Sequence, residues 1–272
     1  MQMLTEEGHI HVAGMSLEYR LIGAPPSRSP TIVMLHEGLG SAGTWGEFPR
    51  RVFERTRASV FVYSRPGYGT SPPVQDGLPV DYIKRHALDV LPKLLEAIGF
   101  RQGLLLGHSD GASMATAYAG NIQDPRVLGL VLMAPHFCVE PETLAEIRNA
   151  RNAFETGDLR QRLARYHDNI DAAFFGWNDV WLNPGFAAFN LREELAKINI
   201  PMLIIRGEGD RYGTNRQIEM ARETCRGPIE ILLMPDCGHL PHREKSAQTV
   251  DAIDRFYRRL LPERTSSPRR ET

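Results

Sequence analysis

The chain has 272 residues, of which 42% are hydrophobic, and its 32 Lys and Arg nearly balance its 33 Asp and Glu. This length and composition suit one large globular domain with a sizeable core. Because the charges balance, the whole surface has no net field that would attract nucleic acid or an anionic membrane. Three scattered cysteines form no disulfide framework, and no apolar run approaches the roughly 18 residues of a membrane span, so we expect a soluble cytoplasmic protein.

The first predicted elements are two short antiparallel strands within residues 9–22, where apolar and polar residues alternate around Gly14. Continuous apolar runs, typical of strands buried in a parallel sheet, follow at 31–35, 59–63, 104–106, 127–133, 201–205 and 229–234. Helical spacing of apolar residues predicts helices at 45–57, 81–98, 112–119, 216–224 and 244–261. Asp81 is the expected N-cap of the second helix, and Gly99 its expected stop.

Between residues 136 and 199 the pattern changes to charged, helical and aromatic-rich segments without a buried strand. We predict a small helical cap there, inserted after the sixth strand into a core domain formed by residues 1–135 and 200–262. The polar tail, 263–272, is expected to be disordered. Alternating strands and helices predict an α/β fold with a mostly parallel, doubly wound sheet, whose ligands bind beyond the carboxyl ends of the strands.

One of these strand ends carries the sequence Gly107-His108-Ser109-Asp110-Gly111, between an apolar run and a helix. It matches the G-x-S-x-G turn, in which a strained backbone exposes the central serine above the end of a sheet. A side chain at either glycine would collide with the neighbouring helix or strand. We therefore predict Ser109 as a nucleophile; the alternative is a tight turn with a solvent-facing serine.

A serine hydroxyl needs a base and an orienting acid to become nucleophilic at neutral pH. The strand at 202–205 leads into Asp210, and the strand at 229–234 leads into His239, which is the expected order of nucleophile, acid and histidine. Asp210 is therefore the candidate acid and His239 the candidate base. Other residues nearby in the sequence compete for these roles. Glu208 is the alternative to Asp210, and Asp236 and His242 compete with His239.

The oxygen of a tetrahedral intermediate needs hydrogen-bond donors fixed in advance. One expected donor is the backbone N–H of Asp110, and the other is that of Gly38, in the loop His36-Glu37-Gly38-Leu39-Gly40 that follows the strand at 31–35. The alternative interpretation of this loop is a plain glycine turn.

Together these motifs, with Arg65-Pro66-Gly67-Tyr68-Gly69-Thr70-Ser71, resemble the α/β-hydrolase superfamily over nearly the whole chain apart from the cap. The resemblance implies a serine hydrolase that works without metal or organic cofactor. Members usually carry His-Gly at the oxyanion loop, whereas the second position here is Glu37. The elbow Gly-His-Ser-Asp-Gly looks like that of the valacyclovir hydrolase group, in which the acidic residue after the nucleophile helps to recognise a substrate amino group. Only Asp110 carries this over.

The candidate substrate-binding residues are Glu37, Asp110, His136, Trp177 and Trp181. The cap aromatics either bind a small amphipathic substrate or simply pack the cap onto the core, and His136 either faces the pocket or caps the first cap helix. We also expect Glu37 to pair with Arg65 and brace the oxyanion loop, while Asp110 binds an amine or joins the same network.

The leading hypothesis is hydrolysis of a small carboxylic ester or related acyl compound, including amine-bearing ones. The alternatives are a C–C bond hydrolase of a ring-cleavage pathway with the same triad, and a non-catalytic binding protein of this fold. The expected partner is a small-molecule substrate, without nucleic acid or membrane, and the sequence is compatible with a monomer or a homodimer.

Overall fold

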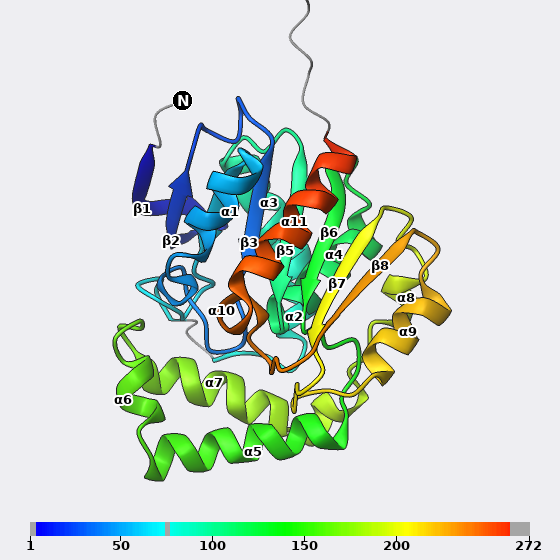
Figure 1. Ribbon diagram of the computed structural model, residues 1–272. Coiled ribbons are helices and arrows are strands. Elements are labelled where there is room, and N and C mark those ends of the chain that lie inside the picture. The colour runs from blue at the N-terminus through cyan, green and yellow to red at the C-terminus, as the bar shows by residue number, and fades with distance from the viewer. Residues whose placement is uncertain (1–3, 74–76, 262–272) are drawn as a thin grey trace, which may run out of the picture.

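The computed structural model of the chain describes residues 4–73 and 77–261. Its centre is an eight-stranded sheet with the order β1-β2-β4-β3-β5-β6-β7-β8. The strands are β1 (Thr5–Val12), β2 (Met15–Ile22), β3 (Thr31–Leu35), β4 (Ser59–Tyr63), β5 (Gly103–His108), β6 (Val127–Met133), β7 (Met202–Gly207) and β8 (Ile229–Met234). The sheet occupies the middle of the molecule (Figure 1).

The sheet is antiparallel at one side and parallel over the rest. β1 and β2 form a hairpin through Ala13 and Gly14, which have φ angles of 53° and 79°, and β2 pairs antiparallel with β4. From β4 to β8 all neighbouring strands are parallel. The carboxyl ends of these strands therefore meet at one edge of the sheet, where ligand sites of doubly wound folds lie. The predicted fold class is confirmed.

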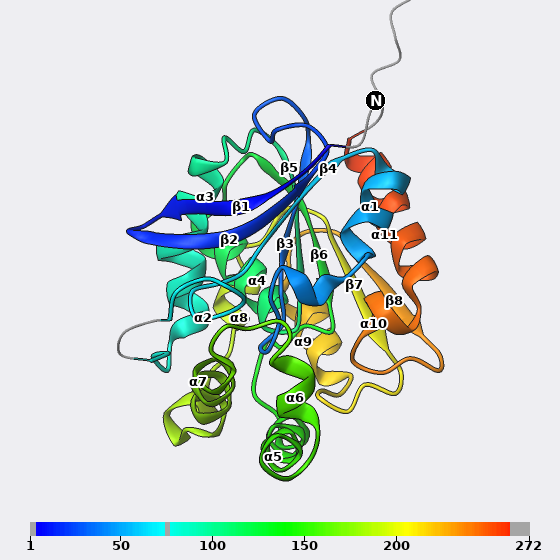
Figure 2. The ribbon, with the colours of Figure 1, turned by 90° about the vertical axis from the view of Figure 1, so that its left-hand side faces the viewer.

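Helices cover both faces of the sheet, as Figure 2 shows for α1 and α11 on one face and α3 on the other. The helical segments of the core are η1 (Gly43–Trp45), α1 (Phe48–Thr56), α2 (Tyr82–Arg85), the π-helical η2 (His86–Val90), α3 (Leu91–Ala97), α4 (Asp110–Ile122), α9 (Arg216–Thr224), α10 (Pro241–Glu244) and α11 (Ser246–Leu260). Within the described residues, no helix is both long and apolar enough to cross a membrane.

Two helices begin later than the sequence predicts. The helix expected from residue 45 begins at Phe48, because Gly46 takes a φ of 55° and ends the short η1 before it. The helix expected from residue 244 begins at Ser246, because Lys245 is not helical and separates it from α10. Asp81 does precede α2, but its carboxylate accepts a hydrogen bond from Arg85 and makes no cap bond to the backbone.

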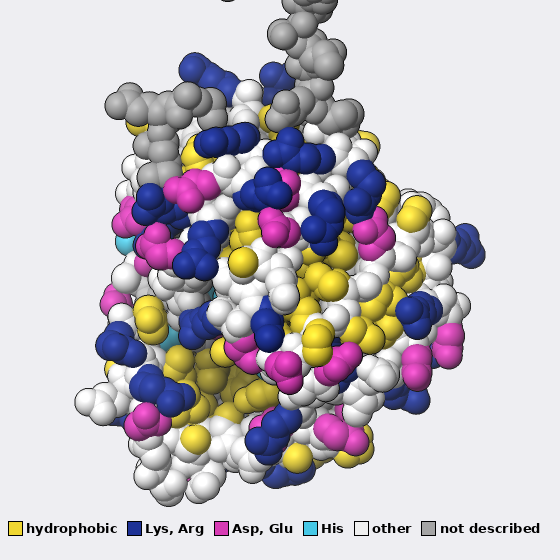
Figure 3. Space-filling view, viewed as in Figure 1, with side chains coloured by type: hydrophobic (Ala, Val, Ile, Leu, Met, Phe, Trp, Pro, Cys, Tyr) yellow, Lys and Arg dark blue, Asp and Glu magenta, His cyan; other side chains and the backbone are white. Residues whose placement is uncertain are grey.

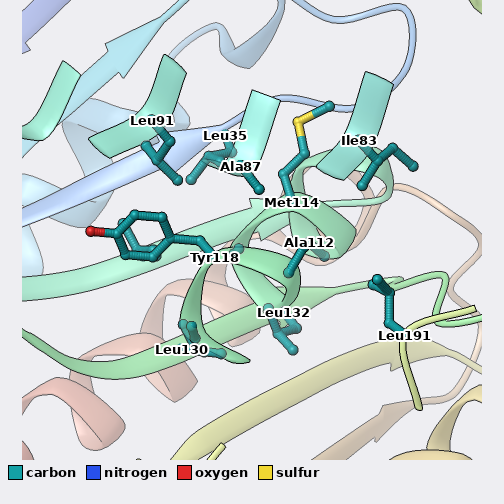
Figure 4. Close-up of a cluster of buried hydrophobic side chains, with 14 of the residues drawn as sticks. Leu35, Ile83, Ala87, Leu91, Ala112, Met114, Tyr118, Leu130, Leu132 and Leu191 are labelled. Atoms are coloured by element: carbon teal, nitrogen blue, oxygen red, sulfur yellow. The ribbon is translucent and has the colours of Figure 1, made fainter. Parts of the chain in front are cut away.

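The core on one face of the sheet is built around α4, the helix that begins just after the nucleophile candidate. Figure 4 shows its side chains between those of the sheet and those of α2 to α3. The buried side chains labelled there are Leu35, Ile83, Ala87, Leu91, Ala112, Met114, Tyr118, Leu130, Leu132 and Leu191. Burying one such large apolar side chain stabilises the fold by about 1.5–3 kcal/mol. This packing fixes the start of α4 against the sheet.

The segment between β6 and β7 contains five short helical pieces and no strand of the sheet. They are α5 (Pro141–Thr156), α6 (Leu159–Leu163), α7 (Ile170–Leu182), η3 (Pro184–Ala188) and α8 (Arg192–Leu195). α5, α6 and α7 lie together at the edge of the sheet where the parallel strands end (Figures 1 and 2). We call residues 136–199 the cap. The predicted disordered tail, 263–272, lies outside the described residues.

Candidate active site

The turn between β5 and α4 holds Ser109 in a strained conformation, with φ 52° and ψ −118°. The two glycines around it permit this close approach: a Cβ on Gly107 would lie 2.3 Å from the carbonyl oxygen of Gly111, and one on Gly111 would lie 2.0 Å from that of Leu35. The packing reason predicted for both glycines is therefore confirmed. Such strain is typical of a functional residue that its surroundings hold in place.

His239 and Asp210 are brought together from the ends of β8 and β7. Nδ1 of His239 lies 2.9 Å from Oδ1 of Asp210, which also accepts a 2.9 Å hydrogen bond from the backbone N–H of Tyr212. Burial alone would raise the pKa of Asp210, but His239 and these hydrogen bonds lower it to about 2. The ionised carboxylate fixes the proton of His239 on Nδ1, which leaves Nε2 with a lone pair for a substrate or nucleophile proton.

The competing residues occupy other places. Glu208 and Asp236 are exposed. His242 is buried, and its ring packs against Trp45 and the ring of His108, with centroids 5.0 and 4.8 Å away. Of the acids and histidines considered, Asp210 and His239 are thus the pair in hydrogen-bond contact.

The hydroxyl of Ser109 has its hydrogen-bond contact with another histidine, His136, which follows β6. Oγ of Ser109 lies 3.4 Å from Nδ1 of His136, and Nε2 of His136 donates to the carbonyl of Tyr212 at 3.1 Å. This second bond places the ring proton on Nε2, so Nδ1 accepts the hydrogen bond from the serine hydroxyl. Burial first, and His239 second, lower the pKa of His136 to about 4. His136 therefore faces the nucleophile and does not cap α5, whose N-cap position is Glu140.

The rings of His136 and His239 are neighbours, with centroids 5.6 Å apart. His239 has an ionised carboxylate as its hydrogen-bond partner, whereas Nε2 of His136 bonds to a neutral carbonyl. Catalytic hydrogen bonds are often long before substrate binds. In the free protein the hydroxyl of Ser109 contacts His136, and its contact with His239 stays a prediction. Sequence reasoning located His136 near the pocket but missed its contact with the nucleophile.

The loop after β3 is braced by Arg65, which is buried at the end of β4. Its backbone N–H donates to Nε2 of His36 at 3.0 Å, and its guanidinium donates to the backbone carbonyls of His36 and Glu37. The bracing role expected of Arg65 is therefore present, but the predicted partner was wrong. Arg65 holds the carbonyl of Glu37, not its carboxylate, because the Glu37 side chain points to His108.

The Glu37 carboxylate and the His239 backbone are joined through His108. Oε2 of Glu37 lies 3.4 Å from Nδ1 of His108, and Nε2 of His108 lies 2.8 Å from the carbonyl oxygen of His239. Burial would raise the pKa of Glu37, but its hydrogen bond with His108 and the nearby His242 keep it well below the usual value. This chain of contacts couples the oxyanion loop to the loop of the candidate base.

Asp110, the residue after the nucleophile, is buried in a network of its own. Its carboxylate accepts a short hydrogen bond from the hydroxyl of Tyr82, which in turn accepts one from the indole N–H of Trp181 at 3.0 Å. Burial raises the pKa of Asp110, and Arg65 and Tyr82 partly oppose this. The side chain thus lies in a hydrogen-bond network with Tyr82 and Trp181, and not in the expected one with Glu37; its binding of an amine stays a prediction.

The cap is fastened directly to the core loops around the site. Nδ1 of His167 accepts a hydrogen bond from the N–H of Gly69 at 3.0 Å, and its Nε2 donates to the carbonyl of Leu39 at 3.1 Å. Asp168 adds a backbone bond to Gly69. Figure 3 shows hydrophobic side chains in the hollow between the core and the cap, just above α7. The sequence signal for this contact is the Tyr166-His167-Asp168 segment of the cap.

The two cap tryptophans named from the sequence both lie in α7 and face the core. Trp181 packs against Phe186 and the ring of His136, with centroids 4.8 and 5.4 Å away. Trp177 lies over Gly38, the expected oxyanion donor. These aromatics therefore pack the cap onto the core, and their role in substrate binding stays a prediction.

Residues 32–252 match the model of the alpha/beta hydrolase family. The chain belongs to this family and is an enzyme of the hydrolase class. The resemblance of its elbow to valacyclovir hydrolases stays a prediction.

Relatives and neighbours of the chain differ in what they act on. A proline iminopeptidase of Lactobacillus crispatus is 29% identical over 288 residues, covering 92% of this chain and 97% of its own. A bifunctional esterase/perhydrolase of Acinetobacter calcoaceticus is 26% identical over 230 residues, covering 73% and 80%. The crystal structure of 2-hydroxy-6-oxo-6-phenylhexa-2,4-dienoate hydrolase from Rhodococcus superposes with a TM-score of 0.76 at 15% identity, covering 94% of this chain and all of that one. This last likeness concerns the fold.

Proposed function

We propose that the protein is a serine hydrolase that cleaves small carboxylic esters or related acyl compounds through an acyl-enzyme. The observation that carries the proposal is the 2.9 Å hydrogen bond between His239 and an ionised, buried Asp210, at the edge of the sheet where the strained Ser109 also lies. The esterase relative supports the same chemistry.

In this mechanism Ser109 Oγ bonds to the carbonyl carbon while its proton passes to Nε2 of His239, and the π electron pair of the carbonyl moves onto the oxygen. The backbone N–H groups of Gly38 and Asp110 donate hydrogen bonds to the oxygen that carries this negative charge. The oxygen's electron pair returns, the bond to the leaving alkoxide breaks, and His239 gives the alkoxide its proton. Water then repeats the sequence on the acyl-enzyme and releases the acid. Asp210 stabilises the imidazolium throughout.

An amine-bearing substrate is a second candidate, because a proline iminopeptidase is similar over nearly the whole chain. The internal hydrogen bonds of Asp110 count against that carboxylate as the amine's partner, since a cation would have to displace Tyr82 or compete with Arg65. A matched pair of substrates, an aminoacyl ester and its des-amino analogue, tests this point. Equal kcat/KM values would remove amine recognition from the proposal.

The test of the main proposal is the time course of p-nitrophenyl acetate hydrolysis, followed by intact mass in the first seconds. We expect a burst of nitrophenol and a mass increase of one acetyl group, both lost in Ser109→Ala. A vinylogous diketone substrate, cleaved faster than the ester and without an acyl adduct, would instead support C–C hydrolysis. Folded protein without turnover of either compound would favour the binding-protein alternative. We retain the expectation of a small-molecule substrate in the cytoplasm, with no nucleic-acid or membrane partner.

A further inference from the structure

Two tryptophans of α7 differ in one respect that bears on the reaction. The indole N–H of Trp181 has a protein partner, the hydroxyl of Tyr82 at 3.0 Å. The indole Nε1 of Trp177, one helical turn earlier, is buried without a hydrogen-bond partner among the described residues, and only 6% of the residue is exposed. A buried donor left unpaired is destabilising, so such a group calls for a functional explanation.

The position of this N–H supplies the explanation. A Cβ placed on Gly38 would lie 2.0 Å from Nε1 of Trp177, closer than to Cδ1 at 2.5 Å or Cε2 at 2.6 Å. The nitrogen corner of the indole therefore lies over the Cα of Gly38. This puts the unpaired donor beside the backbone amide expected to bind the substrate's carbonyl oxygen.

Among the described residues, no group accepts a hydrogen bond from this N–H. The nearby side-chain acid, Asp110, is occupied by Tyr82, and the Glu37 carboxylate lies against His108. The carbonyls of His36 and Glu37 are held by Arg65. The free hydrogen-bonding capacity at this end of the oxyanion loop is thus a donor, and it fits an acceptor oxygen brought by the substrate.

We propose that the indole N–H of Trp177 is a third donor of the oxyanion hole, supplied by the cap to the carbonyl oxygen of the substrate. This inference rests on the proposed serine hydrolase function. As Ser109 adds to the carbonyl carbon and the π electrons move to oxygen, the N–H meets the growing charge; the proton stays on nitrogen. The hole is then complete only while α7 covers Gly38, which makes cap position part of transition-state stabilisation.

The sharpest test replaces Trp177 by 3-benzothienylalanine, which keeps the shape of the indole but has sulfur in place of N–H. Trp177→Phe is the simpler second variant. Because the lost bond forms mainly in the transition state, we expect kcat for p-nitrophenyl acetate to fall roughly tenfold to a hundredfold, with KM within about twofold. The free energy of unfolding should not fall in the isosteric variant, since no bond of the free protein is lost.

The same replacement at Trp181 is the matched control. It removes an N–H that has a protein partner, so the unfolding midpoint in urea should drop there and not at Trp177. Wild-type kcat in the isosteric Trp177 variant, or an effect confined to KM, would overturn the inference. A wild-type enzyme that forms no acyl-enzyme at Ser109 would instead overturn the proposed function, and the two failures are therefore distinguishable.

Discussion

Replacing Asp210 by Asn tests the interaction on which the proposed chemistry depends. The change keeps the shape of the side chain and removes the charge that fixes and stabilises the ring of His239, 2.9 Å away. An imidazole without this carboxylate is a weaker base and holds its proton less well once it has taken it from Ser109. We expect kcat to fall by about 10³- to 10⁴-fold, as in other triads that lose the acid's charge.

The pKa of Asp210 also gives a magnitude for its contribution to the free energy of unfolding. Although burial would raise its pKa, Asp210 has a pKa of about 2 in the folded protein, against 3.8 for a free side chain. The difference corresponds to roughly 2 kcal/mol of native-state stabilisation. Because the folded pKa is the lower one, this stabilisation is complete above about pH 4 and is lost as the pH falls through about 2. Asp210→Asn should therefore lower the free energy of unfolding at pH 7 by about 2 kcal/mol.

Ester turnover and urea unfolding of Asp210→Asn, measured beside Glu208→Gln, check both numbers. Glu208 lies two residues away but is exposed, so its variant should match the wild type. Activity of Asp210→Asn within tenfold of the wild type, with a large loss in Glu208→Gln, would refute the assignment of the acid.

Three further predictions follow from the packing and the titrating groups. Gly111→Ala should lower the free energy of unfolding by more than about 3 kcal/mol in urea, because the new Cβ would lie 2.0 Å from a carbonyl oxygen. Gly46→Ala should cost less, about 1–3 kcal/mol, because nothing lies within 4 Å of the new Cβ and only the backbone strain of φ 55° and ψ −130° remains. Arg65→Lys should lower kcat/KM about tenfold while the protein stays folded, because an ammonium cannot hold both carbonyls that the guanidinium spans; unchanged kinetics would contradict the bracing role. The free energy of unfolding should decline as the pH falls from about 6.5 toward 4. Burial lowers the pKa of His86 to about 3, so over this range the unfolded chain takes up a proton that the native state excludes. In His86→Phe the pH dependence of the free energy of unfolding should shrink by up to about 1.4 kcal/mol per pH unit.

The sequence was sufficient for the parts of the site that depend on the chain order of strand ends. Gly107 and Gly111 carried their own structural reason, a backbone approach that excludes a Cβ. Asp210 and His239 could be named because each follows a buried apolar strand, and parallel strands end at one edge of the sheet. These inferences use local pattern and topology alone.

The direction of individual side chains could not be derived in this way. The pairing of Glu37 with His108, and of Arg65 with backbone carbonyls, depends on which way each side chain leaves its loop. The contact between His136 and Ser109 depends on how the chain leaves β6 toward the cap. The cap was recognised only by its composition, because its helices are ordered by tertiary contacts such as those of His167 and not by a motif.

Covalent labelling by a fluorophosphonate probe, read by intact mass, tests the central claim most directly. We expect one adduct on the wild type, none on Ser109→Ala, and at least a hundredfold slower labelling of His239→Ala, because the hydroxyl is nucleophilic only with its base. His136→Ala is the informative companion. Labelling that survives in His239→Ala but disappears in His136→Ala would contradict the account, since the base would then be the histidine that contacts Ser109 in the resting structure.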